Sequence, residues 1–292
     1  MFTVSRSKNK TKEERRVTDL ANKVIWITGA SSGIGKALAQ TAAQQNTKLI
    51  LSGRRVEALE SLAAELPVDC LVLPFEVTDY GVLEEKVDEA WAWQGRVDVL
   101  VNNAGISQRC LAIDAKPEVY TDLINVDLIA PIWLTQLQLS RMADAGGGHI
   151  IGISSVAGRI GAPLRTAYSA AKFGLIGYMD ALRTEVDRTH NIKVTNILPR
   201  SVATDVSRNA LTGDGSKRGM SDAVIDAGDD PMDCARCIWE AVNADKPEYI
   251  YAKEMEMGLA QMRHGDPDTF FNAIADFGAQ TVAAYWKEKE GA

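Results

Sequence analysis

The sequence predicts one α/β domain built on a doubly wound, mostly parallel sheet of seven strands with helices on both faces. Three observations lead to this prediction. Short apolar runs alternate with helix-length segments from Lys23 onward, the first run leads into a glycine-rich turn, and no repeat or low-complexity linker interrupts residues 23–252. A chain of 292 residues could hold two domains of about 150 residues each, but α/β proteins of this size often form a single domain.

Seven segments are predicted strands because they are short and almost continuously apolar, as strands buried on both faces of a parallel sheet are. They are VIWIT (24–28), KLILS (48–52), CLVL (70–73), VDVLV (97–101), HIIGIS (149–154), KVTNIL (193–198) and EYIYA (248–252). Segments between them, such as GKALAQTAAQQ and VEALESLAAEL, place alanine and leucine on one helical face. Right-handed crossovers then cover both faces of the sheet, and ligands bind beyond the carboxyl ends of its strands.

The composition excludes several classes of protein. Hydrophobic residues make up 46% of the chain and charged residues 24%, as in ordinary globular proteins. The balance of 32 Lys and Arg against 39 Asp and Glu gives a net charge of −7, which predicts no nucleic-acid partner for the body of the protein. No run reaches the roughly 18 apolar residues of a membrane span, so no transmembrane segment is expected.

The cysteines and histidines are interpreted as structural. The cysteines are too few and too scattered for a secreted disulfide framework, and the first residues lack the apolar core of a secretion signal, so we expect a cytoplasmic location. Cys234 and Cys237 form a CxxC in a helical pattern without a second pair or a nearby histidine, so no metal site is expected. The cysteines are Cys70, Cys110, Cys234 and Cys237, and the histidines are His149, His190 and His264.

Three segments outside the strand–helix pattern have their own expected roles. Residues 1–22 are polar and mixed in charge, which is typical of a solvated tail. Residues 203–230 are rich in Gly and Asp and suit a mobile substrate lid over the carboxyl edge of the sheet. Residues 253–292 keep helical apolar positions, so we expect a helical extension that packs on the body or on a neighbouring subunit. Its apolar side chains include Phe270, Phe271, Ile274, Phe277 and Trp286.

The segment TGASSGIG (28–35) predicts a dinucleotide site. It follows the first strand and opens a helix, so Gly29, Gly33 and Gly35 would allow a tight turn and a close approach of the backbone to a pyrophosphate. A tight turn without a ligand is the alternative. The position of the loop between the first strand and a helix favours the dinucleotide.

The end of the second strand bears on which dinucleotide binds. An NAD site places a carboxylate there to hold the ribose 2′-hydroxyl, but this chain has Gly53 followed by Arg54 and Arg55. Guanidinium groups suit a 2′-phosphate through bidentate, charge-assisted hydrogen bonds. Two solvated arginines at a helix start are the alternative. With no acid to compete, the pattern favours NADP(H).

YSAAK (168–172) predicts acid–base chemistry. Tyr168 and Lys172 are four residues apart, on one face of a helix that begins near Thr166. A free phenol has a pKa near about 10, and an ammonium one turn away favours its anion. Ser155 follows the apolar strand HIIGIS, so its hydroxyl would lie at the carboxyl edge, where substrates bind. Surface packing of the pair and capping of the strand end by Ser155 are the alternatives.

These motifs together resemble the short-chain dehydrogenase/reductase family. TGASSGIG (28–35), NNAG (102–105), INVDL (124–128), ISSVAG (153–158) and YSAAK (168–172) occur in the family's order and spacing, over roughly residues 23–252. The resemblance implies a Rossmann-type fold. Within the family, SGRRVEAL, NALTGDGSKRGMSD and residues 230–242 resemble proteins of the dehydrogenase/reductase member 7 type.

The resemblance implies a catalytic tetrad. Ser155 would bind the substrate oxygen, and Tyr168 would donate or accept a proton as hydride moves between the nicotinamide and the substrate. Lys172 would bind the nicotinamide ribose and stabilise the Tyr168 phenolate, and Asn125 would hold a water through its backbone. Ser154 would be a neighbour rather than the catalytic serine. The alternative for Asn125 is a polar helix residue satisfied locally.

The resemblance also implies the cofactor-binding residues. Besides Tyr168 and Lys172, these are Gly29, Ser31, Ser32, Gly33, Ile34, Gly35, Arg54, Arg55, Glu76, Val77, Asn103, Ala104, Gly105, Pro199, Val202 and Thr204. Members of the family lead us to expect a homodimer or homotetramer.

Two positions depart from the family pattern. Glu76-Val77 replaces the usual Asp-Val, where the acid contacts the adenine amino group, and the longer carboxylate can still accept that hydrogen bond. Arg200 replaces the glycine after Pro199. If the backbone there needs a positive φ, Arg200 is strained by about 1 kcal/mol or more. If it does not, the guanidinium could lie beside the cofactor or the substrate.

Four arginines raise the question of an acidic substrate. Arg109, Arg159 and Arg165 fall in segments that resemble substrate loops, and together with Arg200 they suggest a substrate that carries an acidic or phosphate group. The alternative is that these arginines face solvent or a partner subunit.

The sequence therefore predicts an NADP(H)-dependent oxidoreductase. It would transfer hydride between nicotinamide and a carbonyl or secondary alcohol of a small organic substrate, acting on the CH–OH group of donors. Two alternatives stay open: a dehydratase or epimerase that turns over no cofactor, and a catalytically silent nucleotide sensor or scaffold, which only Arg200 favours. The sequence does not identify the substrate.

Overall fold

The computed structural model describes residues 20–290, and the predicted tail of residues 1–22 lies almost wholly outside them. Its centre is one sheet of seven strands, all of whose neighbouring pairs are parallel, in the order β3-β2-β1-β4-β5-β6-β7. The predicted fold class is confirmed. The strands are β1 (Val24–Thr28), β2 (Lys48–Ser52), β3 (Cys70–Val72), β4 (Val99–Asn102), β5 (Gly148–Ile153), β6 (Ile192–Pro199) and β7 (Glu248–Tyr251).

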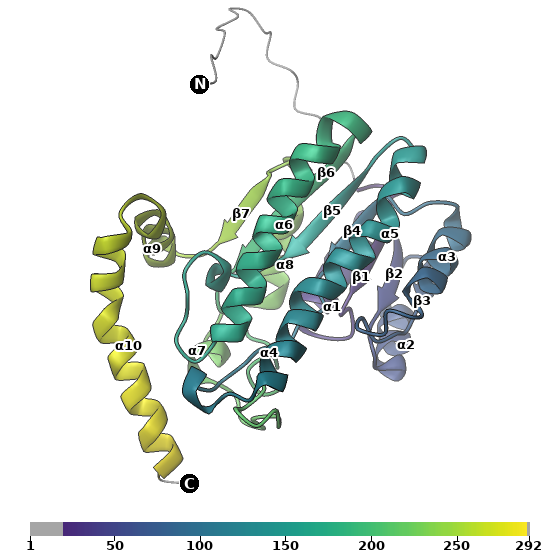
Figure 1. The fold of residues 1–292 in the computed structure, drawn as a ribbon. Coiled ribbons are helices and arrows are strands. Elements are labelled where there is room, and N and C mark those ends of the chain that lie inside the picture. Colours follow the sequence, from purple (N-terminus) through teal and green to yellow (C-terminus); the bar gives the residue numbers. More distant parts are fainter. Residues whose placement is uncertain (1–19, 291–292) are drawn as a thin grey trace, which may run out of the picture.

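Helices cover both faces of the sheet (Figure 1). One apolar layer joins the sheet to α1 (Gly33–Ala43), α2 (Val56–Glu65) and α8 (Pro231–Asn243). The opposite layer joins it to α3 (Leu83–Gln94), α5 (Ala130–Asp144) and α6 (Thr166–His190), with α4 (Pro117–Ile124) leading into α5. All five residues of β1 are buried, as the continuous apolar run predicts for a central strand.

Buried polar groups in the two layers are satisfied locally. The Trp26 indole donates to Ser52 Oγ at 2.8 Å, and the Trp239 indole of α8 donates to the Leu38 carbonyl of α1 at 3.1 Å. At the start of α8, the Asp230 carboxylate accepts the Met232 N–H, which caps this helix. These bonds fix α8 against α1, so the helix that follows residues 203–230 has a defined position.

The connection order creates a switch point in the middle of the sheet. The chain runs from β1 outward to β2 and β3, then returns to β4 on the other side of β1. Ligands of doubly wound sheets bind where the carboxyl ends of the strands diverge in this way. The loops after β1 and β4, which carry the glycine-rich segment and NNAG, meet at that point.

The C-terminal residues form two helices at the β7 side of the molecule. They are α9 (Glu254–Gly265) and α10 (Pro267–Glu290), and α10 stands apart from the layers that cover the sheet (Figure 1). Tyr285 and Lys289 of α10 each donate to the Asp114 carboxylate, at 2.8 and 3.0 Å, which ties the end of α10 to the body.

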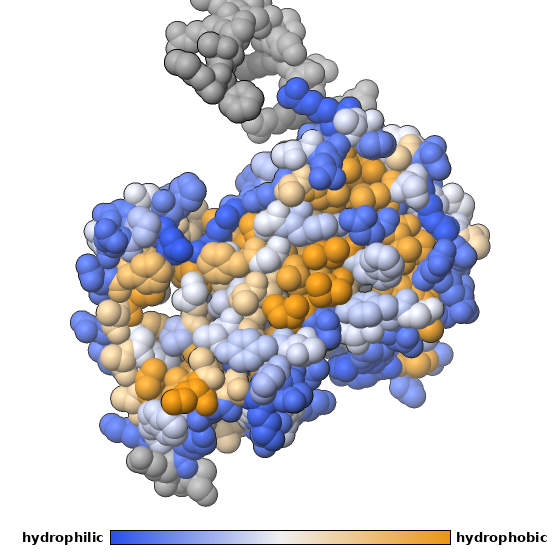
Figure 2. All heavy atoms as spheres, in the orientation of Figure 1, coloured by the Kyte–Doolittle hydropathy of each residue, from blue (hydrophilic) through white to orange (hydrophobic). Residues whose placement is uncertain are grey.

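The apolar side chains of this extension are distributed unevenly. Phe270 is buried and Ile274 half-buried, whereas Phe271, Phe277 and Trp286 are exposed. Figure 2 shows apolar atoms on α10 and also over the layer of α5 and α6. Within residues 20–290, none of the helices combines the length and the apolarity that crossing a bilayer requires.

The predicted structural cysteine and histidine sites occupy different environments. Cys234 is buried in the core, where desolvation raises the pKa of its thiol to about 12, and Cys237 is half-buried. His149 is buried with Nε2 at 2.8 Å from Thr195 Oγ1, and burial lowers its pKa to about 3. His190 and His264 are exposed.

Candidate active site

The glycine-rich loop packs directly against the NNAG segment. Gly29 has a φ of +66°, and a Cβ at this position would lie 2.9 Å from the Ala104 Cα. A Cβ at Gly35 would lie 2.3 Å from the Gly29 carbonyl oxygen. Both positions therefore require glycine, one for its backbone angle and both for the close approach.

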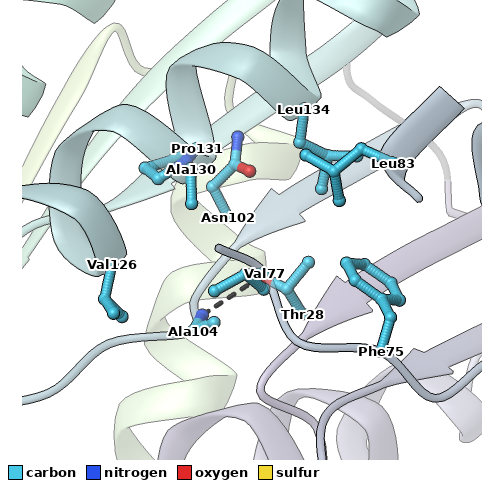
Figure 3. Close-up of a pocket in the computed structure, with 10 residues that line it drawn as sticks. All are labelled: Thr28, Phe75, Val77, Leu83, Asn102, Ala104, Val126, Ala130, Pro131 and Leu134. Atoms are coloured by element: carbon cyan, nitrogen blue, oxygen red, sulfur yellow. Dashed lines mark hydrogen bonds between the residues drawn. The ribbon is translucent and has the colours of Figure 1, made fainter. Parts of the chain in front are cut away.

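Thr28 and Asn103 lock these two loops together. The Thr28 hydroxyl oxygen accepts the backbone N–H groups of Asn103 and Ala104, at 3.0 and 3.1 Å, and the second bond is drawn in Figure 3. The Asn103 amide donates to the Thr28 carbonyl at 2.9 Å and to the Gly29 carbonyl at 3.3 Å. The predicted residues of the two loops thus form one rigid turn at the switch point.

The start of α1 has backbone N–H groups that no side-chain cap binds. Ser32 is the N-cap residue, but its side chain accepts no capping hydrogen bond, so the first N–H groups of α1 are not satisfied by a cap. Ile34 packs on the core, whereas Ser32 is exposed. A glycine turn followed by an uncapped helix start fits a pyrophosphate, which needs backbone approach and free N–H groups.

A narrow apolar pocket lies between this turn and the start of α5 (Figure 3). Val77 and Ala104, two predicted cofactor residues, line it together with Thr28. Its volume is only about 10 Å³, barely enough for one water molecule. The remaining lining residues are Phe75, Leu83, Asn102, Val126, Ala130, Pro131 and Leu134.

Tyr168 and Lys172 lie one turn apart near the start of α6. The Gln108 amide oxygen accepts the Ala167 N–H at 2.8 Å and the Tyr168 N–H at 3.4 Å, which fixes this helix end to the loop after β4. Tyr168 is half-buried, and Lys172 Nζ lies 5.6 Å from the centroid of its ring. The Lys172 ammonium also donates to the Ile153 carbonyl of β5 at 3.1 Å.

Asp127 is a functional candidate that the sequence reasoning missed. Its side chain is completely buried, its Oδ2 lies 3.3 Å from Lys172 Nζ, and its Oδ1 accepts the Ile106 N–H at 2.8 Å. Burial raises the pKa of Asp127 against the opposing effect of the nearby Lys172 ammonium. Burial alone would lower the pKa of Lys172, but the charges of Asp127 and Tyr168 outweigh it and raise that pKa.

Asn125 begins a stretch of π-helix, Asn125–Ile129, between α4 and α5. The Asn125 carbonyl accepts the Ala130 N–H, five residues on, instead of the bond four residues on that an α-helix makes. This wider turn is where Asp127 points inward toward Lys172. The INVDL motif was the only signal for Asp127, and the periodicity of an α-helix does not reveal a π-turn.

Ser155 is the second residue after β5 and is half-buried. Its Oγ accepts the Ala157 N–H at 3.1 Å and donates to the carbonyl of Pro199, the last residue of β6, at 3.4 Å. The Ser154 hydroxyl instead donates to the Lys172 carbonyl at 2.9 Å and is buried. Ser155 is therefore the more accessible of the two hydroxyls at this edge.

Comparisons with known proteins show the family of this chain. Residues 23–214 match the family model described as short chain dehydrogenase. The chain belongs to the short-chain dehydrogenase family. Membership in this family supports an oxidoreductase.

Curated relatives and a solved structure are consistent with this membership. The chain is 38% identical to dehydrogenase/reductase SDR family member 7B of Danio rerio, in a match that covers 89% of this chain and 87% of the relative. It is 36% identical to the Bos taurus protein of that name, in a match that covers 87% of this chain and 81% of the relative. A short-chain dehydrogenase/reductase from Burkholderia phymatum in complex with NAD has the same fold, with a TM-score of 0.75 at 19% identity over 86% of this chain and 96% of that one.

The expectation that no acid competes for Arg54 rests on Gly53, which stands where an NAD site has its carboxylate. Glu76, after β3, accepts a hydrogen bond from Arg54 at 3.2 Å, so that expectation is wrong. The carboxyl ends of β2 and β3 are neighbours, which brings the two side chains together. Arg55 donates to the carbonyl and to the hydroxyl of Ser31, both at 3.2 Å.

Arg200 has an unstrained backbone, and its guanidinium is paired with two carboxylates of the protein. Its φ is not positive, because the non-glycine residues with positive φ among those described are Asn22, Asn46, Leu164, Asn191 and Asp245. Its guanidinium bonds Glu256 of α9 at 2.9 Å and Asp229 at 3.1 Å. The hydrogen bond to Glu256 raises the pKa of Arg200. The family's glycine is thus replaced by a residue that ties the C-terminal extension to the body.

Thr204 and Val202 follow Arg200 toward the glycine-rich loop. The Thr204 methyl group lies 3.0 Å from where a Cβ at Gly33 would be, so this threonine contacts the turn before α1. Val202 is buried in the core, so only its backbone can face a cofactor. An open pocket of about 480 Å³ lies between α1 and residues 203–232.

The predicted lid is anchored to the loop after β4. The Leu211 carbonyl accepts the Arg109 N–H at 2.9 Å, and the Leu211 N–H donates to the Ser107 carbonyl at 2.8 Å. The segment also contains the short helix α7 (Ala223–Asp226). These bonds place residues 207–222 beside the loop that caps α6 and Tyr168.

Proposed function

We propose that this protein is an NADP(H)-dependent carbonyl reductase or alcohol dehydrogenase for a small organic substrate. The observation that carries the proposal is the buried Lys172–Asp127 ion pair beside Tyr168, at the sheet edge where the glycine-rich turn meets NNAG. Acid–base chemistry by a phenol needs a fixed positive charge close to its ring, and this cluster supplies one.

Each residue of the cluster has a definite role in carbonyl reduction. The cofactor, when bound as NADPH, would supply a hydride to the carbonyl carbon and would be oxidised to NADP+. Ser155 donates a hydrogen bond to the carbonyl oxygen, and Tyr168 donates the proton that completes the alcohol. Lys172 stabilises the resulting phenolate and binds the cofactor ribose, while Asp127 holds the Lys172 ammonium in place. Asn125 binds a water through its backbone and passes a proton from solvent, and alcohol oxidation reverses these roles.

The arginines after β2 support NADP(H) over NAD. Arg54 is exposed and pairs with Glu76 at 3.2 Å, and an exposed pair of this kind contributes little stability. A 2′-phosphate carries more charge than one carboxylate and accepts bidentate bonds from guanidinium, so it can displace Glu76. Arg55, which reaches Ser31, offers a second guanidinium to the same phosphate.

The Arg54→Ala variant tests the cofactor assignment. We expect its Kd for NADPH to rise about tenfold, because one charge-assisted hydrogen bond is lost, whereas its Kd for NADH changes less than about twofold. Titration monitored by nicotinamide fluorescence measures both constants. The matched control is Arg236→Ala, an exposed arginine of α8 that pairs with Asp233, and it should leave both constants unchanged. Tighter binding of NADH than NADPH by the wild type would overturn the assignment.

The silent-sensor alternative loses its support. It rested on Arg200, which has an ordinary backbone and two carboxylate partners in the extension. The predicted homodimer or homotetramer remains a prediction, for which the exposed Trp133 of α5 and Phe173 of α6 offer an apolar surface.

A further inference from the structure

The four arginines that suggested an acidic substrate have different partners. Arg109 pairs with Asp222 through Nε at 3.0 Å and Nη2 at 2.9 Å. Arg159 bonds Glu248 and lies 4.0 Å from Asp180. Arg200 pairs with Asp229 and Glu256, as described above. The charges of these three arginines are therefore already compensated by carboxylates of the protein.

Arg165 is the exception. Among residues 20–290 its side chain forms no hydrogen bond and no ion pair, and its guanidinium lies near the ring of Tyr168. The guanidinium carbon lies 6.0 Å from the centroid of the Tyr168 ring. Asp222 is the carboxylate whose charge acts on Arg165, but its Oδ2 is bonded to Arg109. Among the described residues, this guanidinium thus has no carboxylate within hydrogen-bond reach, and it lies next to the predicted acid–base group.

The backbone holds Arg165 in this position. Leu164 has a φ of +63°, a strained angle for a residue with a side chain, and its carbonyl accepts the Cys110 N–H at 3.2 Å. On the other side, the Arg165 carbonyl accepts the Ser169 N–H at 2.8 Å in the first turn of α6. Strain of this kind persists where the surroundings enforce it and is concentrated at ligand sites.

The energetics of Arg165 favour an external anion. The side chain is half-buried, and desolvation lowers the pKa of Arg165 against the effects of Tyr168 and Asp222. A guanidinium removed from water without a carboxylate partner carries an unfavourable desolvation free energy. An anionic ligand group would offset that cost with two parallel charge-assisted hydrogen bonds.

We propose that Arg165 is the anion-binding residue of the active site, so that the substrate carries a carboxylate or a phosphate within a few bonds of the reacting carbonyl. The short separation between the anionic group and the carbonyl follows from the geometry of the site. The carbonyl would bind at the Tyr168 hydroxyl, and the Arg165 guanidinium lies beside the ring of the same tyrosine. The proposal deepens the proposed function and rests on it for the position of the carbonyl.

Charged and neutral substrate pairs test the proposal. Acetoacetate and levulinate are compared with their methyl esters, and hydroxyacetone phosphate with hydroxyacetone, by following NADPH consumption. For the anionic member of a pair, Arg165→Gln should lower kcat/KM by about 30-fold, and for the neutral member by less than about threefold. The pair that responds distinguishes a carboxylate from a phosphate. Arg165→Lys should have a kcat/KM for the anionic substrate between those of Arg165→Gln and the wild type, because lysine keeps the positive charge but cannot make the two parallel hydrogen bonds of a guanidinium.

The outcome that overturns the proposal is an equal loss on charged and neutral substrates, since Arg165 would then act only through Tyr168. No loss on any substrate would overturn it as well. The matched control is Arg188→Gln, an exposed arginine at the other end of α6, which should leave every kcat/KM unchanged.

A binding experiment separates this proposal from the proposed function. Calorimetry measures acetoacetate and hydroxyacetone phosphate binding to protein loaded with NADP+, where no turnover occurs. If no carbonyl is reduced but either anion binds and Arg165→Gln abolishes that binding, the proposed function fails and the anion site stands. If carbonyls are reduced and anion binding is absent or insensitive to Arg165→Gln, the anion site fails and the reductase stands.

Discussion

Replacing Tyr168 with phenylalanine is expected to lower kcat for carbonyl reduction by about 10³-fold, while the Kd for NADPH changes less than about twofold. The substitution removes only the hydroxyl that transfers the proton. The ring, which lies near both Arg165 and Lys172, stays in place. Turnover is measured by NADPH consumption and binding by fluorescence titration of the same preparation.

The control for Tyr168→Phe lies on the same helix. Tyr178 is half-buried in α6 and bonds Gln136 at 3.4 Å, so Tyr178→Phe removes a phenolic hydroxyl away from the cluster. We expect it to keep wild-type kcat. A Tyr168→Phe enzyme that retained more than about a tenth of wild-type kcat would show that another group transfers the proton.

The Asp127→Asn variant is expected to affect stability and catalysis together. It keeps the shape of the side chain but leaves the buried Lys172 ammonium without its counter-charge, so the free energy of unfolding should fall by about 3 kcal/mol. We expect kcat at neutral pH to fall about tenfold, because Lys172 loses protons more easily and stabilises the phenolate less. Urea unfolding and steady-state kinetics measure the two effects.

The pH profile distinguishes this positioning role from a purely structural one. Because burial raises the pKa of Asp127, this group becomes protonated at a higher pH than an ordinary carboxyl as the solution is acidified. Wild-type activity should therefore decline on the acid side, because a neutral Asp127 no longer holds the Lys172 ammonium in place, and Asp127→Asn should lack that decline. The control is Asp122→Asn, which removes one negative charge at an exposed position of α4 and should keep the wild-type pH profile. An unchanged acid limb in Asp127→Asn would contradict the role of this ion pair.

The fold could be predicted because its signals are local. The seven apolar runs fall on the seven strands, and only their ends differ, as in β4, which begins at Val99 where the run begins at Val97. The start of α6 at Thr166 also agrees with the prediction. Continuous burial of parallel strands leaves a pattern that needs no knowledge of distant contacts.

The candidate site could be predicted only where its chemistry follows a motif. The glycine-rich loop, NNAG, Ser155 and the Tyr168–Lys172 pair meet at one edge because strand ends meet there. Asp127 depends on a π-turn that shifts the helical register, and no periodicity in the sequence encodes that shift. The pairing of Arg54 with Glu76 did have a signal, because the second and third strands of such sheets are neighbours.

The partners of the arginines could not be predicted because they depend on long-range contacts. Arg200 meets Glu256, which is 56 residues away, and Arg109 meets Asp222, which is 113 residues away. Sequence spacing does not distinguish these paired arginines from Arg165. Only the arrangement in space shows which guanidinium near Tyr168 has no carboxylate partner.

The most direct test of the central claim is the fate of the hydride. NADPH deuterated at both C4 positions is incubated with the wild-type enzyme and each carbonyl substrate, and the product alcohol is analysed by mass spectrometry. Transfer of hydride from NADPH to the carbonyl carbon predicts one deuterium in each alcohol and one NADPH oxidised for each carbonyl reduced. Product without deuterium, or product formed without net oxidation of NADPH, would contradict the proposed reductase and indicate a non-redox reaction at this site.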